Sequence, residues 1–214
     1  MTSSGLRERK KDRTRATITR VALELFARDG FHATTIPAIA EAADVAPRTV
    51  STYFPSKEGI VFDVYEAAIE RLAARLAQRP AGQPVHDVLR EWFVSEDEQQ
   101  QGPTRGLVPP KDSDDAEFAR LRETAILTDP DLWALQRRYM LPMVGLVAHG
   151  FAADLEIEPD SLQAQIVGES TVAVLLAINA RAARRGTAAM DEFDAAFDFM
   201  RARLMADAIE DGGR

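Results

Sequence analysis

The sequence predicts an all-α protein in two parts, a small N-terminal head of three helices and a larger helical domain behind it. Apolar residues recur three and four positions apart along almost the whole of the 214-residue chain, which is the spacing of a helix that buries one face. No segment shows the alternation of a half-buried strand, and no internal repeat is present. The composition, 46 % apolar and 28 % charged, is that of a globular protein.

The head begins with a basic segment and one long helix. Residues 1–11 are small, polar and basic, and we expect them to form a mobile arm. A helical stripe follows between about Arg13 and Asp29, and Gly30 is suited to end that helix. The stripe consists of Ile18, Val21, Ala22, Leu25 and Phe26.

Two short helices complete the head. Thr35 offers an N-cap hydroxyl for the first of them, and Pro37 falls in its first turn, where proline is tolerated. The bend falls at residues 44–45, and the third helix spans residues 47–53. Two helices joined by a turn of about four residues are a helix-turn-helix unit. We assign this head to residues 12–56.

The remaining residues, 57–214, are expected to form the larger helical domain. A fourth helix, capped by Ser56, should run to about Arg79. The longest predicted loop, residues 99–115, is rich in glycine, proline and acidic residues. Further helices are predicted at 88–98, at 118–129, at 132–152 with a kink at Pro142, at 160–185 and at 190–209.

Charge is divided unevenly between the two parts. Residues 1–57 carry ten Lys and Arg against six Asp and Glu, a net charge of +4, whereas residues 58–214 carry 16 against 28, a net charge of −12. A basic segment on an acidic remainder indicates two parts with different partners. The chain has no cysteine, opens with no apolar signal segment, and its longest apolar run, residues 172–178, is too short to cross a bilayer. We therefore expect a cytoplasmic protein with no membrane partner.

The third helix of the head is the expected contact to double-stranded DNA. The second helix of a helix-turn-helix unit lies in the major groove, with its N-terminal residues against base edges. The base-contacting residues are therefore expected to be Pro47, Arg48, Ser51 and Thr52. The guanidinium of Arg48 has the geometry to bind O6 and N7 of guanine. The phosphate-contacting residues are expected to be Thr35, Thr49, Tyr53 and Lys57.

A known family shares this pattern. In sequence order, residues 34–58 contain TTI, IAEAADV, TV and YFPSKE, which run through both short helices, the bend and the entry to the fourth helix. The pattern resembles the DNA-binding domain of the TetR family of bacterial repressors, over roughly residues 13–65. The resemblance implies a homodimer whose C-terminal domain binds a ligand and then releases a palindromic operator. It also implies base contacts at Pro47, Arg48 and Ser51, and phosphate contacts at Thr35, Tyr53 and Lys57.

Three positions depart from the common pattern of that family. Asp44 stands in the turn where glycine is usual, although aspartate tolerates the left-handed conformation better than most residues. Ala46 stands where serine often caps the third helix, so that capping hydrogen bond should be missing. Pro37 stands where a polar DNA contact is common. We expect none of the three to break the fold.

The C-terminal helices are expected to form a homodimer interface. One recognition helix makes few base contacts, so useful specificity calls for two half-sites and two chains. Residues 172–180 are apolar on nearly all faces, which indicates a partner on the outer face. The alternative is an internal core helix of a monomer. The expected interface residues are Ala173, Ala177 and Ala180, joined by Phe197 and Leu204 of the last helix.

The middle helices are expected to enclose an effector pocket. Its candidates are Trp92, Phe93, Phe118, Leu121, Trp133, Tyr139, Met140 and Met143, which could equally be ordinary core. Pro142 favours a pocket because a kink opens space beside it. The stretches at 121–122 and 159–162 are similar to the TetR subgroup that binds acyl-CoA-like ligands. We therefore expect a small hydrophobic or acyl-CoA-like effector, with a cationic drug as the rival because of the acidic excess.

Other function classes have less support in the sequence. None of the three histidines, His32, His86 and His149, has a histidine four residues away or a cysteine partner, so we expect no metal, no cofactor and no enzymatic activity. We interpret the acidic cluster at 112–115 as a solvent-exposed segment at the start of a helix. A DNA-binding or protein-docking scaffold without an effector remains the alternative to a ligand-responsive regulator.

Overall fold

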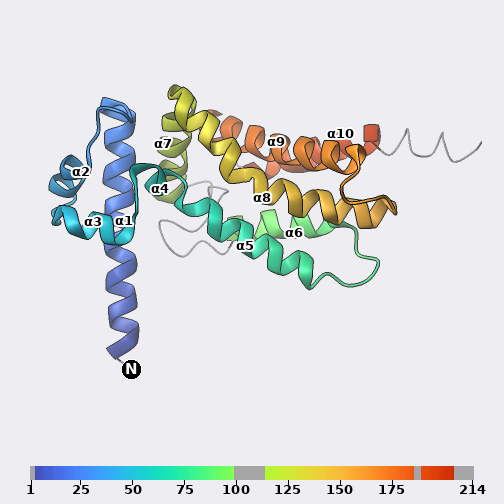
Figure 1. The fold of residues 1–214 in the computed structure, drawn as a ribbon, viewed down its shortest axis with the longest axis horizontal. Coiled ribbons are helices and arrows are strands. Elements are labelled where there is room, and N and C mark those ends of the chain that lie inside the picture. The colour runs from blue at the N-terminus through green and yellow to red at the C-terminus, as the bar shows by residue number, and fades with distance from the viewer. Residues whose placement is uncertain (1–2, 99–113, 186–188, 205–214) are drawn as a thin grey trace, which may run out of the picture.

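A computed structural model describes residues 3–98, 114–185 and 189–204 of the chain. Every regular element within these ranges is a helix, which confirms the all-α prediction. The predicted loop at 99–115 lies almost wholly outside the described residues. The helices are α1 (Ser3–Asp29), α2 (Ile36–Ala42), α3 (Pro47–Tyr53), α4 (Lys57–Val61), α5 (Asp63–Ala77), α6 (Val85–Glu98), α7 (Asp114–Thr128), α8 (Pro130–Leu155), α9 (Leu162–Arg185) and α10 (Ala189–Leu204) (Figure 1).

Helix α1 begins about ten residues earlier than predicted, because the segment expected to be an arm continues the helix from Ser3. Residues 6–13 consist mainly of leucine, arginine, glutamate and lysine, which are good helix formers. The N-terminal half of α1 projects beyond the rest of the head (Figure 1). Gly30 ends the helix as predicted, with φ +90° and its N–H bonded to the carbonyl of Phe26.

The turn between α2 and α3 is a Schellman motif built around Asp44. The N–H of Val45 bonds to the carbonyl of Ala40 at 2.9 Å, and the N–H of Asp44 bonds to that of Glu41 at 3.2 Å. Asp44 itself has φ +53°, so this aspartate takes the left-handed conformation that glycine usually supplies. Ala46 provides no side-chain cap to α3, as predicted. The bend is therefore fixed by backbone hydrogen bonds.

The fourth helix was predicted to be continuous but is divided at Phe62 into α4 and α5. Phe62 is 1 % exposed, and its backbone angles, φ −100° and ψ 9°, lie outside the helical range. Its ring stacks on Tyr139 of α8 with centroids 4.6 Å apart and meets Tyr65 edge-on at 5.5 Å. Burial of this ring therefore accompanies a break that periodicity alone does not show.

Helices α5 to α10 form the larger part of the molecule, and α8 and α9 pack against each other along their length (Figure 1). Gly168 of α9 allows this close approach, since a Cβ there would lie 2.8 Å from the carbonyl oxygen of Val144. Ion pairs join other helices: Arg90 of α6 bonds to Asp194 of α10, and Arg181 of α9 bonds to Glu192 of α10. Helix α8 continues past Pro142.

The hydrophobic core is contiguous from the head into the larger domain. One cluster of buried side chains extends from Ile18 in α1 to Phe197 in α10. The division into 1–11, 12–56 and 57–214 therefore stays a prediction about folding units. By length and apolar composition, one helical stretch in the described ranges, 162–182, could span a membrane, and 44 % of it is buried within the chain. The apolar run at 172–178 is thus part of this longer apolar stretch.

Candidate nucleic-acid interface and effector core

Helix α3 has one buried anchor and an exposed polar face. Val50 is fully buried and holds the helix against the core of the head. Pro47, Arg48, Ser51 and Thr52, the predicted base-contacting residues, are all exposed, so their side chains lie together on the free surface. Helices α2 and α3 stand at one end of the molecule, on the side of α1 opposite the C-terminal helices (Figure 1). This placement leaves α3 open to a DNA groove.

The hydroxyl groups of α3 are used inside the helix. Ser51 Oγ donates to the carbonyl of Pro47 at 3.4 Å, and Thr52 Oγ1 donates to that of Arg48 at 2.8 Å. With its hydroxyl hydrogen engaged, the Thr52 oxygen keeps only its lone pairs, so it can act as an acceptor. In this rotamer α3 offers a strong donor at Arg48 and an acceptor at Thr52.

The predicted phosphate-contacting residues surround α3 but have different local roles. Thr35 caps α2 by accepting a hydrogen bond from the N–H of Ala38 at 3.2 Å, which leaves its own hydroxyl hydrogen to donate. Tyr53 and Thr49 are half-buried. Phosphate contact by these residues stays a prediction.

Lys57 holds the head together as well as lying near the DNA-facing surface. Its Nζ donates to the carbonyls of Phe31 at 2.7 Å and Thr34 at 2.8 Å, and lies 4.4 Å from the centroid of the Phe31 ring. An ammonium group has three donors. One N–H is therefore left for a phosphate, and the residue also ties α4 to the turn between α1 and α2.

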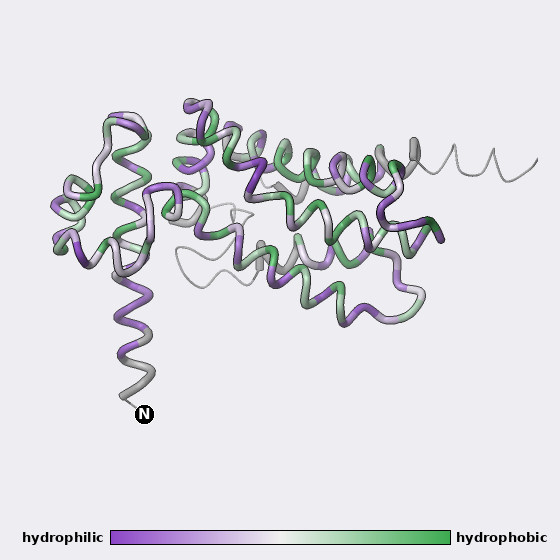
Figure 2. The backbone as a smooth tube through the Cα atoms, in the orientation of Figure 1, coloured by the Kyte–Doolittle hydropathy of each residue, from purple (hydrophilic) through white to green (hydrophobic). Residues whose placement is uncertain are grey.

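The projecting half of α1 is strongly hydrophilic (Figure 2). Arg7, Arg9, Lys10 and Lys11 are exposed there. A row of cations on a helix beside the recognition helix can displace counterions from a phosphate backbone.

The residues predicted to enclose an effector lie, with one exception, in the interior. Trp92, Phe93, Phe118, Met140 and Met143 are buried, and Leu121 and Tyr139 are half-buried against the same core. Trp133 contradicts the prediction, because its side chain is 60 % exposed. Buried residues of α8 recur at 132, 136, 140, 143 and 147, and a helix turns by about 100° from one residue to the next, so position 133 falls off that face.

A buried pair of polar side chains lies among these apolar residues, at positions that were not predicted from the sequence. Gln136 Nε2 of α8 donates to the Tyr65 hydroxyl of α5 at 2.8 Å, with both residues buried. Burial, followed by the nearby Glu123 carboxylate, raises the pKa of Tyr65. Burial also raises the pKa of Glu123 on α7 to about 7, although Arg122 and Arg184 act in the opposite direction. Nothing in the helical periodicity distinguishes such positions from ordinary surface residues.

Helix α9 carries an exposed apolar row on its outer side. Leu162 is 68 % exposed and Ile166 is 49 % exposed, and Ala173 and Ala177 are exposed further along the helix. The structure contradicts two predicted interface residues: Ala180 is 8 % exposed, and Phe197 is 5 % exposed and stacks on Phe193 at 4.1 Å. Helical rotation turns both toward the chain's own core. The side chain of Leu204 lies outside the described residues.

Arg15 joins the head to the larger domain, and a ring stack follows just beyond the boundary. Arg15 of α1 binds Asp63 at the start of α5 through both carboxylate oxygens, and its guanidinium lies 4.6 Å from the centroid of the Phe54 ring. The hydrogen bond to Asp63 raises the pKa of Arg15. Within the larger domain, Phe62 at the junction of α4 and α5 stacks on Tyr139 of α8. A displacement of α5 or α8 would therefore reach α1 and α4.

A helix-turn-helix unit that is anchored on α1 and exposes Arg48 on its second helix is typical of DNA-binding proteins of the helix-turn-helix class. Residues 18–64 match the family model described as bacterial regulatory proteins, tetR family. Over 79 residues, 37 % of this chain, the sequence is 47 % identical to the HTH-type transcriptional regulator TcmR of Streptomyces glaucescens, and the match spans 35 % of that relative. Residues 18–64 therefore form a DNA-binding domain of the TetR type, and the match to the curated relative spans about a third of that relative's length.

Solved structures share the whole architecture at low sequence identity. FadR of Thermus thermophilus, a TetR-family transcriptional repressor in complex with lauroyl-CoA, is 22 % identical with a TM-score of 0.54, covering 87 % of this chain and 92 % of that one. NalD, the secondary repressor of the MexAB-OprM multidrug efflux pump in Pseudomonas aeruginosa, is 16 % identical with a TM-score of 0.57, covering 90 % and 95 %. At these identities the likeness establishes the fold.

Proposed function

We propose that this protein is a one-component transcription regulator of the repressor type, which binds a palindromic DNA operator as a homodimer in the cytoplasm and leaves it when an effector binds. The observation that carries the proposal is the exposed face of α3 with Arg48, Ser51 and Thr52, set in a head that matches the TetR family. In the major groove, Arg48 reads guanine, and Thr52 offers an acceptor and a methyl group.

The dimer forms through α9, joined by α10. The exposed row from Leu162 to Ala177 supports this, because an unpaired apolar helix face on a soluble protein marks an interaction surface. Alanines at 173 and 177 let a second helix approach closely. A two-fold axis at this face places one head at each end of the dimer, as two operator half-sites require. Sedimentation of the Ile166→Glu variant as a monomer, against a dimeric wild type, would support this surface.

The effector lies between α5, α7 and α8. This part of the core contains Met140, Met143 and the Phe62–Tyr139 stack together with the polar groups of Tyr65, Gln136 and Glu123. A site of this composition takes a largely apolar molecule with at least one hydrogen-bonding group. Acyl-CoA thioesters and cationic drugs are the two candidate classes. FadR in complex with lauroyl-CoA shares the fold, which favours acyl-CoA thioesters. NalD, named as repressor of a multidrug efflux pump, also shares the fold, which supports cationic drugs as the second class.

Release follows from the contacts between the core and the head. An effector beside Tyr139 displaces the Phe62 ring, which lies between α4 and α5. Helix α4 is bound through Lys57 to the turn before α2, and α5 is bound through Asp63 to Arg15. The shift rotates the head, and the two recognition helices then no longer fit successive major grooves.

The DNA-binding part of the proposal is tested by selecting bound fragments from random duplexes and then measuring affinity for the selected site. Arg48→Ala is expected to cost about 1–3 kcal/mol and to relax the base preference at one position of each half-site. Arg138→Ala removes the same charge from an exposed position on α8 and serves as the matched control. Unchanged affinity and base preference in the Arg48 variant would refute the assigned reading residue.

The effector is tested on the same operator. A ligand of the correct class lowers operator affinity and raises the thermal midpoint of the free protein, and acyl-CoA thioesters and cationic drugs are compared at equal concentration. Tyr139→Ala, which removes the Phe62 stack, is expected to keep DNA binding but lose release. If no compound shifts either measurement, the alternative of an effector-independent DNA-binding scaffold is favoured.

A further inference from the structure

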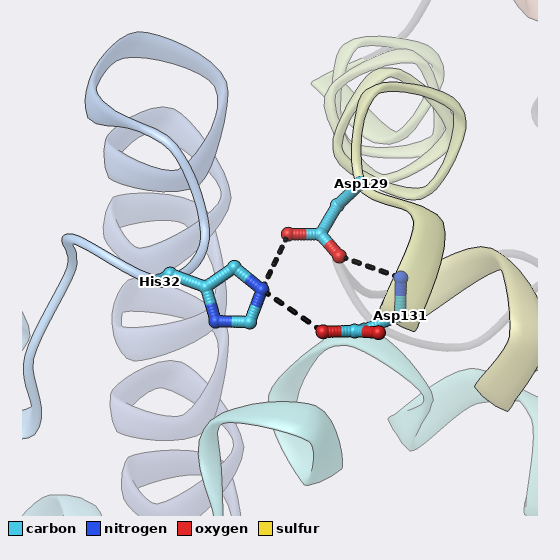
Figure 3. A group of neighbouring side chains, drawn as sticks. All are labelled: His32, Asp129 and Asp131. Carbon is cyan, nitrogen blue, oxygen red and sulfur yellow. Dashed lines mark hydrogen bonds and ion pairs between the residues drawn. The ribbon is translucent and has the colours of Figure 1, made fainter.

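We propose that His32, Asp129 and Asp131 form a binding site for one divalent transition-metal ion of the zinc class, and that this ion ties the head to the C-terminal helices. His32 lies in the turn between α1 and α2, whereas the two aspartates lie at the junction of α7 and α8 (Figure 3). Metal binding rests on these three residues alone. Only the effect of the ion on DNA rests on the proposed function.

The three side chains present one ligand atom each to a common point. His32 Nε2 lies 3.2 Å from Asp129 Oδ2 and 3.3 Å from Asp131 Oδ2, and one ligand atom of each residue lies within 4.8 Å of the others (Figure 3). Zinc bonds to nitrogen and oxygen of about 2.0–2.2 Å place neighbouring ligands of a tetrahedral site about 3.3–3.6 Å apart. The observed distances are close to that edge length. The side chains of His32 and Asp131 are exposed, so they can move to make up the small difference.

Asp129 is held ready by the helix that it caps. Its Oδ1 accepts hydrogen bonds from the N–H groups of Asp131 at 3.0 Å and Leu132 at 3.1 Å, which leaves Oδ2 directed toward His32 (Figure 3). Its side chain is only 11 % exposed. Second hydrogen bonds of this kind orient metal ligands and strengthen sites.

The other side of the site is also fixed. The ring of Phe31 meets the His32 ring edge-on, with centroids 5.6 Å apart. Phe31 is 6 % exposed, and its carbonyl accepts the hydrogen bond from Lys57. The imidazole is therefore carried by a turn that is anchored to α4.

The composition of the site selects the class of ion. Two carboxylates close together carry two negative charges, and a neutral imidazole compensates neither, so a divalent cation balances the site. One imidazole nitrogen with two carboxylate oxygens suits zinc and its transition-metal neighbours better than magnesium or calcium, which prefer oxygen ligands alone. Water can complete the coordination sphere because His32 and Asp131 face solvent. The competing occupant is a proton, which would make the cluster an imidazolium–carboxylate ion pair.

An ion here would couple domains, because its ligands come from both sides of the boundary between the head and the larger domain. Helix α7, which ends at Thr128 just before Asp129, contacts α1 and carries the buried Glu123. A bound ion would fix the turn before α2 against the end of α7. It is therefore expected to change the affinity for the operator by restricting the position of the head.

The test uses the untagged full-length chain, stripped with a chelator and returned to neutral pH. Competition with a chromogenic zinc chelator is expected to show one saturable Zn²⁺ site per chain, and Co²⁺ should give a visible d–d absorption band. Asp131→Asn and His32→Asn are each expected to weaken Zn²⁺ binding at least about tenfold. His149→Gln removes an exposed imidazole elsewhere and should leave binding unchanged. Asp131 is exposed, so its variant keeps the fold even if the His32 variant does not.

Thermal unfolding gives a second reading without DNA. Zn²⁺ at about a hundredfold excess over its dissociation constant should raise the midpoint of the wild type by several degrees, whereas Mg²⁺ should not. Equal Zn²⁺ binding by the wild type and the Asp131→Asn variant would overturn the site. Absence of saturable Zn²⁺ binding to the wild type would overturn it as well. Operator affinity with and without Zn²⁺ is measured separately. Failure of the proposed DNA binding would therefore not affect the conclusion on Zn²⁺ binding.

Discussion

The close packing of α9 on α8 leads to a quantitative prediction at Gly168. A Cβ added there would lie 2.8 Å from the carbonyl oxygen of Val144 and 2.9 Å from the Cβ of Ala148. The third near atom is the backbone nitrogen of Ala148 at 3.2 Å. All three atoms are backbone or the first side-chain atom, so they cannot move aside without separating the two helices. Alanine in a helix interior would otherwise stabilise by about 1 kcal/mol relative to glycine. We expect the clash to outweigh this gain.

Gly145 supplies the matched control within the same helix pair. It lies inside α8, and a Cβ added there would have no neighbour within 4 Å. Gly145→Ala should therefore stabilise by about 0.5–1 kcal/mol. Overpacking of a close-packed site costs about 1–3 kcal/mol, so Gly168→Ala should be less stable than Gly145→Ala by that amount, because the helix propensity is common to both.

Urea unfolding followed by circular dichroism measures this difference, with all proteins at one concentration because a dimer's stability depends on it. The Gly168 variant should have the lower midpoint at an unchanged slope. Equal midpoints for the two variants would show that α8 and α9 do not approach as closely as described. The dimer surface on α9 would then need to be reconsidered, since its position depends on the same packing.

Three further predictions follow from local contacts. Ala46→Ser should supply the missing cap of α3 and stabilise by about 1 kcal/mol, seen as a rise in thermal midpoint, and no rise would mean that α3 begins elsewhere. Asp63→Asn should cost about 1 kcal/mol, because it removes the negative charge and one of the two oxygens that accept from Arg15; urea unfolding measures this cost, and wild-type stability in the variant would mean that this pair does not join α1 to α5. Glu123 has a pKa of about 7 in the folded chain against 4.5 ordinarily, so the folded state holds the proton more tightly and the wild type loses stability as pH rises from 4.5 to 7. Glu123→Gln should not show this loss, so its free energy of unfolding relative to that of the wild type should rise by on the order of 2 kcal/mol between pH 5 and pH 8. If the difference between the two free energies of unfolding does not change with pH, burial of the ionisable group is contradicted.

Local sequence signals were sufficient for the head. Gly30, Thr35 and Asp44 each act at the ends and bends where their backbone or capping chemistry predicts them. Such residues act through neighbours a few positions away, so a linear pattern contains the whole interaction. The division at Phe62 escaped prediction because the ring on which Phe62 stacks, Tyr139, lies 77 positions further along the chain.

The sites formed between distant segments were harder to predict for the same reason. His32 has no ligand partner within a helical turn, and its two aspartates follow almost a hundred residues later. Gln136 and Tyr65 meet across two helices that periodicity describes separately. Trp133 was misplaced because a run of bulky residues does not show which face each one takes, whereas one step of helical rotation decides between core and solvent.

The uninterrupted core has a practical consequence for anyone who wishes to excise a minimal DNA-reading fragment. Truncation after Phe62 would expose Ile60, Val61 and Phe62, three side chains that are at most 1 % exposed in the intact chain. Such a fragment would expose an apolar surface to water and would be expected to self-associate. A usable truncation has to retain enough of α8 to cover that apolar surface, or has to replace these three residues with polar ones.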